Sequence, residues 1–141
     1  MTTFKVTRKI RFGQTDAAGI TFYPRLVEMI NDIVEDFFEQ EVRYSYKEMI
    51  VETDFGVPTV NLNVTFKRPA ELEDKVGWYL NVLRIGNSSF TVDIKAKVAD
   101  AELLTAEVTL AYVKGKGTVM SSHPLPEKVK AVLKEYIIKE V

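Results

Sequence analysis

One acidic residue, Asp16, lies among small residues in the segment FGQTDAAGITFYP (12–24), just before a helical apolar pattern begins. Gly19 follows it and lets the backbone turn tightly. The first backbone N–H groups of a helix starting near Tyr23 stabilise negative charge that develops on a ligand. A carboxylate beside such groups can attack an acyl group or activate the water that attacks it. These residues predict a site for acyl transfer to water.

The same carboxylate has a structural interpretation. Aspartate often caps a helix or closes an Asx-turn, and the residue spacing alone leaves this alternative open. Gln14, two residues earlier, could orient water or the carboxylate, or could simply be a solvated loop residue.

Composition removes several classes of function. The chain has 141 residues, the size of one domain, a net charge of −1 and no basic block, so nucleic acid is not the expected partner. The chain has no cysteine, which excludes thiol nucleophiles and disulfides. Its one histidine, His123, cannot form a multi-histidine metal site. Neither a leader-like nor a membrane-spanning apolar stretch is found, which predicts a cytoplasmic protein without membrane insertion. No Gly-x-Ser-x-Gly elbow or phosphate loop is present, and the chemistry requires no metal or organic cofactor.

The elements that must position Asp16 follow from the hydrophobic period. Alternation predicts a strand over 4–12, with Phe4, Val6, Ile10 and Phe12 on its apolar face. A 3.6-residue period predicts a helix over 23–38, with Pro24 in its first turn. A short helix is possible around 46–50. Four further strands follow at 59–67, 76–82, 90–98 and 104–112, and a helix begins at about 127. This order predicts a single α+β domain over 1–141, in which a five-stranded antiparallel sheet wraps around the long helix.

The strand at 59–67 has the features of a sheet edge. Pro58 stands at its start, and its second face carries Thr59, Asn61 and Asn63. An unprotected edge can pair with a copy of itself, so we expect a homodimer formed through this strand. The same polar side chains could instead reach an acyl pocket or face water; Thr59, near the strand start, is the better pocket candidate.

At this point the sequence resembles a known family. The segment TDAAGITFYPRLVEM is similar to the hotdog-fold acyl-CoA thioesterases of the 4-hydroxybenzoyl-CoA thioesterase type, which include the Tol-Pal-associated thioesterases. The segments VNLNVTFKRPAELED, LLTAEVTLAYV and HPLPEKV extend the resemblance over most of the chain. It implies a hotdog fold that hydrolyses a small acyl- or aryl-acyl-CoA to the free acid and CoA. It also implies dimers, often assembled into homotetramers, with each active site at a subunit interface.

The resemblance assigns roles to three residues of the loop. It places the catalytic carboxylate, as nucleophile or general base, on Asp16, and the N–H that polarises the thioester carbonyl on Tyr23, with Gly19 allowing close approach. Pro24 matches the 4-hydroxybenzoyl-specific branch. Asn31 replaces an acidic residue of that branch, however, and Gly86-Asn87-Ser88 replaces its basic cluster. Activity class therefore transfers better than substrate identity.

Coenzyme A carries phosphates and a pantetheine arm, so basic and hydroxyl groups at strand ends are candidates to bind it. The expected substrate-binding residues are Gln14, Ile20, Thr59, Asn61, Lys67, Arg68, Ser88 and Ser89. Two other functions of this fold are alternatives, and the residues argue against the first of them. A hydratase generally needs a histidine working with an acid, and none lies near Asp16 in sequence. A non-catalytic acyl-CoA-binding or scaffold protein would bind the ligand without turning it over.

Overall fold

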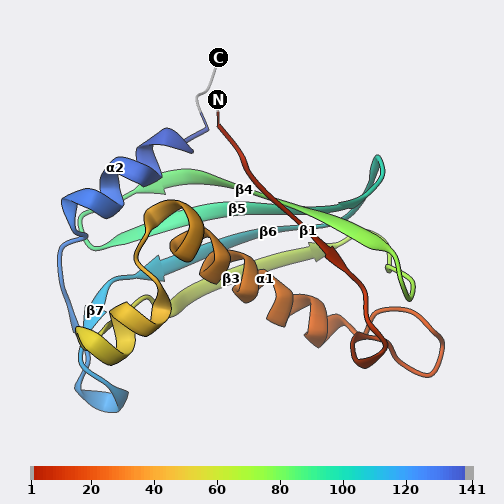
Figure 1. Cartoon of the computed structure of the whole chain (residues 1–141), viewed down its shortest axis with the longest axis horizontal. Coiled ribbons are helices and arrows are strands. Elements are labelled where there is room, and N and C mark those ends of the chain that lie inside the picture. Colours follow the sequence, from red (N-terminus) through yellow and green to blue (C-terminus); the bar gives the residue numbers. More distant parts are fainter. Residues whose placement is uncertain (1, 139–141) are drawn as a thin grey trace.

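The computed structural model describes residues 2–138, and its centre is a curved antiparallel sheet wrapped around one helix (Figure 1). The strand order is β1-β4-β5-β6-β3, so β1 and β3 form the two edges. This is the predicted α+β architecture, with the strand after Pro58 at an edge as expected. The strands are β1 (Phe4–Lys9), β3 (Thr59–Phe66), β4 (Lys75–Ile85), β5 (Ser89–Val98) and β6 (Ala101–Ala111).

Helix α1 (Tyr23–Phe37) fills the concave side of the sheet, and its apolar period explains why. Pro24 occupies the first turn, where its missing N–H leaves no intrahelical hydrogen bond unmade. The helix continues into a wider turn over Phe38–Val42, which ends where Arg43 takes a left-handed conformation (φ 60°). Its buried side chains face the sheet: Leu26, Met29, Ile30, Ile33, Val34 and Phe37.

The end of the sheet farther from the Asp16 loop is closed by short elements (Figure 1). A second helical segment runs over Lys47–Glu52, and β2 (Phe55–Gly56), β7 (Val113–Lys114) and β8 (Ser121–Ser122) form a small separate sheet. The hydroxyl groups of Tyr44 and Tyr112 lie 3.0 Å apart. This contact joins the link between the two helical segments to the link between β6 and β7. Helix α2 (Glu127–Glu135) then packs against β4. The predicted start of this helix at residue 127 is confirmed.

The first strand is shorter than the alternation predicts. β1 ends at Lys9, and the chain turns through a 3₁₀ helix over Phe12–Gln14. Ile10 is buried as expected, but the placement of Phe12 on the same core face is wrong, because its side chain is 81% exposed. Alternation continues in the sequence past the point where the backbone leaves the sheet, and the period alone does not mark that point.

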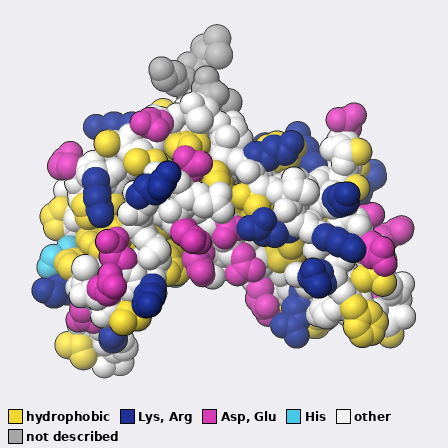
Figure 2. All heavy atoms as spheres, viewed as in Figure 1, with side chains coloured by type: hydrophobic (Ala, Val, Ile, Leu, Met, Phe, Trp, Pro, Cys, Tyr) yellow, Lys and Arg dark blue, Asp and Glu magenta, His cyan; other side chains and the backbone are white. Residues whose placement is uncertain are grey.

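Strand β3 is exposed along nearly its whole length. Apolar side chains of the face toward α1 are only partly covered, with Leu62 42% and Phe66 43% exposed. The strand contains no charged residue, and natural proteins usually place charges on an edge to prevent pairing. In the space-filling view the molecule is hollowed along this side, between the 38–56 segment and the 10–22 loop (Figure 2). Acidic side chains gather above the hollow (Figure 2), and α1 carries the exposed residues Glu28, Asp32 and Glu35.

Candidate active site

The Asp16 loop is fixed by backbone hydrogen bonds at both of its ends. Within the loop, Asp16 N–H donates to Ile20 O at 2.9 Å and Gly19 N–H to Asp16 O at 3.0 Å. The positive φ of Gly19, 78°, is a conformation that other residues adopt only with strain. The loop is tied to the segment before β4, because Thr21 N–H donates to Ala70 O at 2.8 Å. These bonds hold the carboxylate on a rigid support.

The Asp16 carboxylate points out of this loop and is exposed. Its Oδ1 accepts the Ala18 N–H at 2.8 Å, which is the Asx-turn of the structural interpretation. It does not cap α1, because the N-cap is Phe22 and no side chain bonds to that helix end. Within residues 2–138 no Lys, Arg or His forms an ion pair with it. The Asx-turn orients the carboxylate and leaves its other oxygen accessible to a substrate.

Tyr23 supplies a free backbone donor at the first position of α1. The first N–H groups of any helix lack partners within the helix. Pro24 has none to offer, and Arg25 N–H already donates to Phe22 O at 2.9 Å. Among the described residues no acceptor is found for Tyr23 N–H. The residue that the resemblance assigns to carbonyl polarisation is therefore the one with an unused donor.

Asp16 and Tyr23 line different hollows on the surface of a single chain. A cavity of about 520 Å³ is lined by the Asp16 loop and by Phe12 and Leu72. A second, of about 290 Å³, lies between the start of α1 and the end of β3, and includes Tyr23, Lys67 and Arg68. One chain thus places Asp16 and Tyr23 in two separate hollows.

The predicted binding residues divide between the two ends of the sheet. Phe66 pairs with Leu104 at the end that holds the Asp16 loop, and Lys67 follows there. Thr59 pairs with Leu110, and Ser89 with Ala111, at the opposite end. Eight residues of strand separate these ends, about 25 Å at 3.3 Å per residue. Thr59, Asn61, Ser88 and Ser89 of one chain therefore lie far from its own Asp16.

The remaining candidates have local contacts. The Gln14 side chain accepts the Arg11 N–H at 2.8 Å, so it closes the 3₁₀ turn rather than approaching Asp16. Ile20 forms an isolated bridge to Glu71. Lys67 pairs with Glu102 at 2.9 Å across the β3–β6 end. Phe12 and Leu72 were not predicted as residues of the Asp16 cavity. Gly13, directly after Phe12, is a local signal of the 3₁₀ turn, although β1 has already ended at Lys9.

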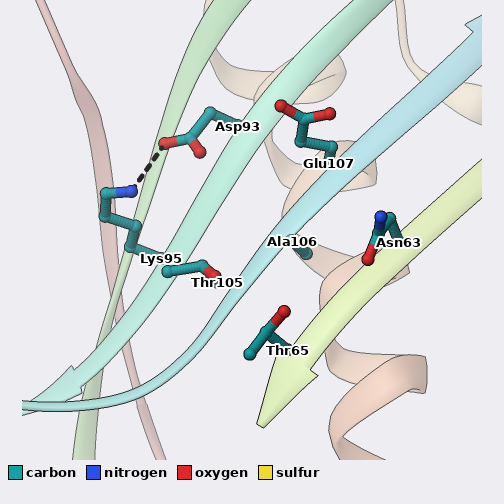
Figure 3. A pocket seen from close by; sticks show the side chains of 7 residues that line it. All are labelled: Asn63, Thr65, Asp93, Lys95, Thr105, Ala106 and Glu107. Carbon is teal, nitrogen blue, oxygen red and sulfur yellow. Dashed lines mark ion pairs between the residues drawn. The ribbon is translucent and has the colours of Figure 1, made fainter. Parts of the chain in front are cut away.

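A polar cavity of about 360 Å³ lies on the convex face of the sheet, away from α1 (Figure 3). Asn63 and Thr65 of β3 line it, whereas Thr59, on the other side of a β-bulge, pairs with the buried Leu110 and does not continue this polar row. Lys95 Nζ lies 3.5 Å from the Asp93 carboxylate in its wall. Burial raises the pKa of Asp93, and the neighbouring ammonium of Lys95 opposes that rise.

His123 lies in the connection before α2, where its ring packs edge-on against Phe55. Residues 2–138 contain no cluster of three His, Asp or Glu side chains suited to a metal ion. Nor does any helix within that range have the length and apolar character needed to cross a bilayer.

Comparison with known proteins gives a consistent result. The model of the thioesterase-like superfamily matches residues 10–133. A 1,4-dihydroxy-2-naphthoyl-CoA hydrolase of Synechocystis is 26% identical over 133 residues, covering 94% of this chain and 90% of that protein. The hydrolase of the same description from Nostoc punctiforme is 26% identical over 126 residues, covering 89% and 83%.

Solved structures confirm that the fold is of the hotdog type. The 1,4-dihydroxy-2-naphthoyl-CoA thioesterase of Synechocystis superposes with a TM-score of 0.85 at 21% identity, covering 95% of this chain and 97% of that one. A gentisyl-coenzyme A thioesterase gives 0.81 at 22% identity, covering 90% and 99%. A 4-hydroxybenzoyl-CoA thioesterase variant in complex with 4-hydroxybenzoyl-CoA gives 0.80 at 17% identity, covering 93% and 98%.

Proposed function

The chain belongs to the thioesterase-like superfamily, and we propose that it hydrolyses an aromatic acyl-CoA to the free acid and CoA. One observation carries this proposal: an exposed, unpaired Asp16 carboxylate on a rigid loop beside a helix start with an unused N–H donor. The aromatic preference is supported by relatives, since two similar proteins are described as 1,4-dihydroxy-2-naphthoyl-CoA hydrolases.

Two routes are open to the carboxylate. As a general base, Asp16 takes a proton from water while the water oxygen bonds to the thioester carbon. As a nucleophile, it attacks that carbon and forms a mixed anhydride, which water then hydrolyses. In both routes the C–S bond breaks, the CoA thiolate leaves and takes up a proton, and the acid is released. The carbonyl oxygen becomes negative on the way, and Tyr23 N–H donates to it.

We propose that the complete site forms between two copies of the chain paired along β3. The edge is uncharged, eight residues long and apolar on one face, which suits strand addition by a second copy. A twofold antiparallel pairing places the Phe66 end of one protomer against the partner's Thr59. The Asp16 loop would then face the partner's Ser88 and the partner's Ser89 at the same junction.

This arrangement gives the other candidates their proposed roles. Lys67 and Arg68, in the Tyr23 cavity, bind the phosphates of CoA, and the hydroxyl groups from the partner bind its pantetheine arm. The partner's Asn61 completes the wall that these hydroxyl groups form around the pantetheine arm. Two such dimers associate into the homotetramer that the resemblance implies, and we place this assembly in the cytoplasm.

A panel of thioesters tests the activity. The purified protein is assayed with acetyl-, butyryl-, palmitoyl-, benzoyl- and 1,4-dihydroxy-2-naphthoyl-CoA, and the released thiol is measured. We expect kcat/KM to be highest for the aryl substrates. Tight binding of these ligands without release of thiol from any of them would favour an acyl-CoA-binding protein instead.

A further inference from the structure

The side chain of Phe12 is the most exposed of the large apolar residues in the described chain, at 81%. It lies in the 3₁₀ turn after β1, next to the loop that carries Asp16. Exposing a phenylalanine ring forfeits the free energy that its burial would supply. A ring in this position therefore indicates a surface that something else covers.

The ring cannot reach the core by a small rearrangement, because the turn is held at several points. Gln14 N–H donates to Arg11 O at 2.9 Å and Thr15 N–H to Phe12 O at 3.1 Å. The hydroxyl of Thr15 donates to the same Phe12 oxygen at 2.8 Å. The Gln14 side chain closes the turn by accepting Arg11 N–H. The sequence thus builds a support that presents the ring outward.

Phe12 shares its cavity with the proposed catalytic acid. The cavity of about 520 Å³ has Phe12 and Leu72 as its apolar walls and Asp16 as its only ionisable lining residue. Leu72 is 41% exposed, and its N–H donates to Gly19 O at 3.3 Å, so this wall is attached to the catalytic loop. Gly13, Ala17 and Gly19 leave space between the walls and the carboxylate.

We propose that Phe12, with Leu72, binds the aromatic ring of the acyl group and selects aryl over short aliphatic thioesters. This inference rests on the proposed function, whose site it deepens. An aryl ring that stacks on Phe12 would place its carboxyl-derived carbon on the Asp16 side of the cavity. Aromatic pairs of this kind add attraction beyond that of area burial alone. A short acyl group does not extend to the ring and gains nothing from it.

The test compares Phe12→Ala with the wild type in binding and in turnover. Binding uses a thioether analogue of benzoyl-CoA, which cannot be hydrolysed, and free CoA as the ligand without an acyl group. We expect the Kd of the analogue to rise roughly 10-fold, equivalent to about 1.4 kcal/mol, while the Kd of CoA changes less than about 2-fold. The value of kcat/KM should fall by a similar factor for benzoyl-CoA and stay unchanged for butyryl-CoA. Phe12→Leu should lie between the two.

Tyr79→Ala is the matched control, because it removes an aromatic ring from the convex face of the sheet, beside Lys5 and Lys97. It should alter neither Kd. Equal losses for the analogue and for free CoA in Phe12→Ala, an unchanged Kd for the analogue, or conversion of a dimer to a monomer would each overturn the inference. Failure of the proposed function is recognised separately, since it appears as absent turnover in the wild type.

Discussion

At the scale of single residues, the proposed site combines an oriented acid with an unused donor. Asp16 is fixed by its bond to Ala18 N–H, and one carboxylate oxygen stays accessible. Tyr23 N–H is free because it belongs to the first turn of α1, where no carbonyl of the helix lies within reach. Neither property requires an unusual side chain. Both depend on where the loop meets α1, and the mechanism that we propose therefore requires no cysteine.

Asp93 allows a test of electrostatics away from the site. Its raised pKa means that the folded protein holds the proton more tightly than the unfolded chain, whose value is near 3.8. Its contribution to the free energy of unfolding therefore falls as pH rises from about 3.8 through the raised value. Asp93→Asn should be more stable than the wild type at pH 7, and the difference should vanish near pH 3.

Urea denaturation at a series of pH values measures this difference. Asp100→Asn, an exposed change in the turn between β5 and β6, is the control and should show no such trend. A variant at Asp93 that is less stable than the wild type at pH 7 would mean that attraction to Lys95 outweighs burial.

At the scale of elements, the Asp16 loop depends on the segment before β4. Thr21 is buried, and its hydroxyl oxygen accepts the N–H of Ala70 at 3.2 Å. Ala70 is fully buried, so no water can replace that acceptor. This contact joins the segment before α1 to the loop between β3 and β4, which lines one cavity with Lys67 and Arg68 and the other with Leu72.

Thr21→Val keeps the side-chain shape and removes the acceptor. The buried N–H of Ala70 then lacks a partner, and we expect a loss of about 1–3 kcal/mol in the free energy of unfolding. Thermal and urea denaturation measure it. Thr7→Val, at an exposed position of β1, should change stability by less than about 0.5 kcal/mol. Equal effects of the two substitutions would show that the contact at Ala70 does not support the loop.

The elements themselves could be predicted from the sequence because their hydrophobic periods are long and regular. The helix at 23–38 and the edge strand after Pro58 are confirmed. The residue at which β1 ends could not be predicted from the hydrophobic period. Phe12 continues the apolar alternation, although the backbone there forms a turn that the Gln14 side chain closes by accepting Arg11 N–H. Leu72 carries no local signal, since only the fold brings it next to Gly19.

At the scale of the whole molecule, we propose that the β3 edge completes the site by pairing with a second copy of the chain. The candidate residues of one chain lie at two ends of the sheet, separated by the length of β3. Twofold pairing along this edge is the proposed arrangement that unites them. The residues that meet across this pairing could not be predicted from the hydrophobic pattern. The pattern identifies the faces and edges of the sheet but not the chain that covers them.

Leu62→Lys tests this assembly by placing a charge on the edge. We expect the dimer to dissociate, because pairing two copies would bring the added ammonium groups close together within the interface. Sedimentation should then report monomers, and thioester hydrolysis should fall at least about 10-fold as the site loses its second wall. Thr7→Lys adds the same charge to the opposite edge strand and should leave both measurements unchanged. A fully active monomer of Leu62→Lys would contradict a site shared between protomers.

The central claim is that Asp16 carries out the hydrolysis, and the turnover of Asp16→Asn tests it most directly. The amide keeps the size and the Asx-turn but removes the base and nucleophile. With benzoyl-CoA as substrate, we predict that kcat falls at least roughly 1000-fold, with unaltered folding and assembly, while Asp100→Asn stays at the wild-type rate. If Asp16→Asn instead turns over within a few-fold of the wild type, the carboxylate is not the catalyst.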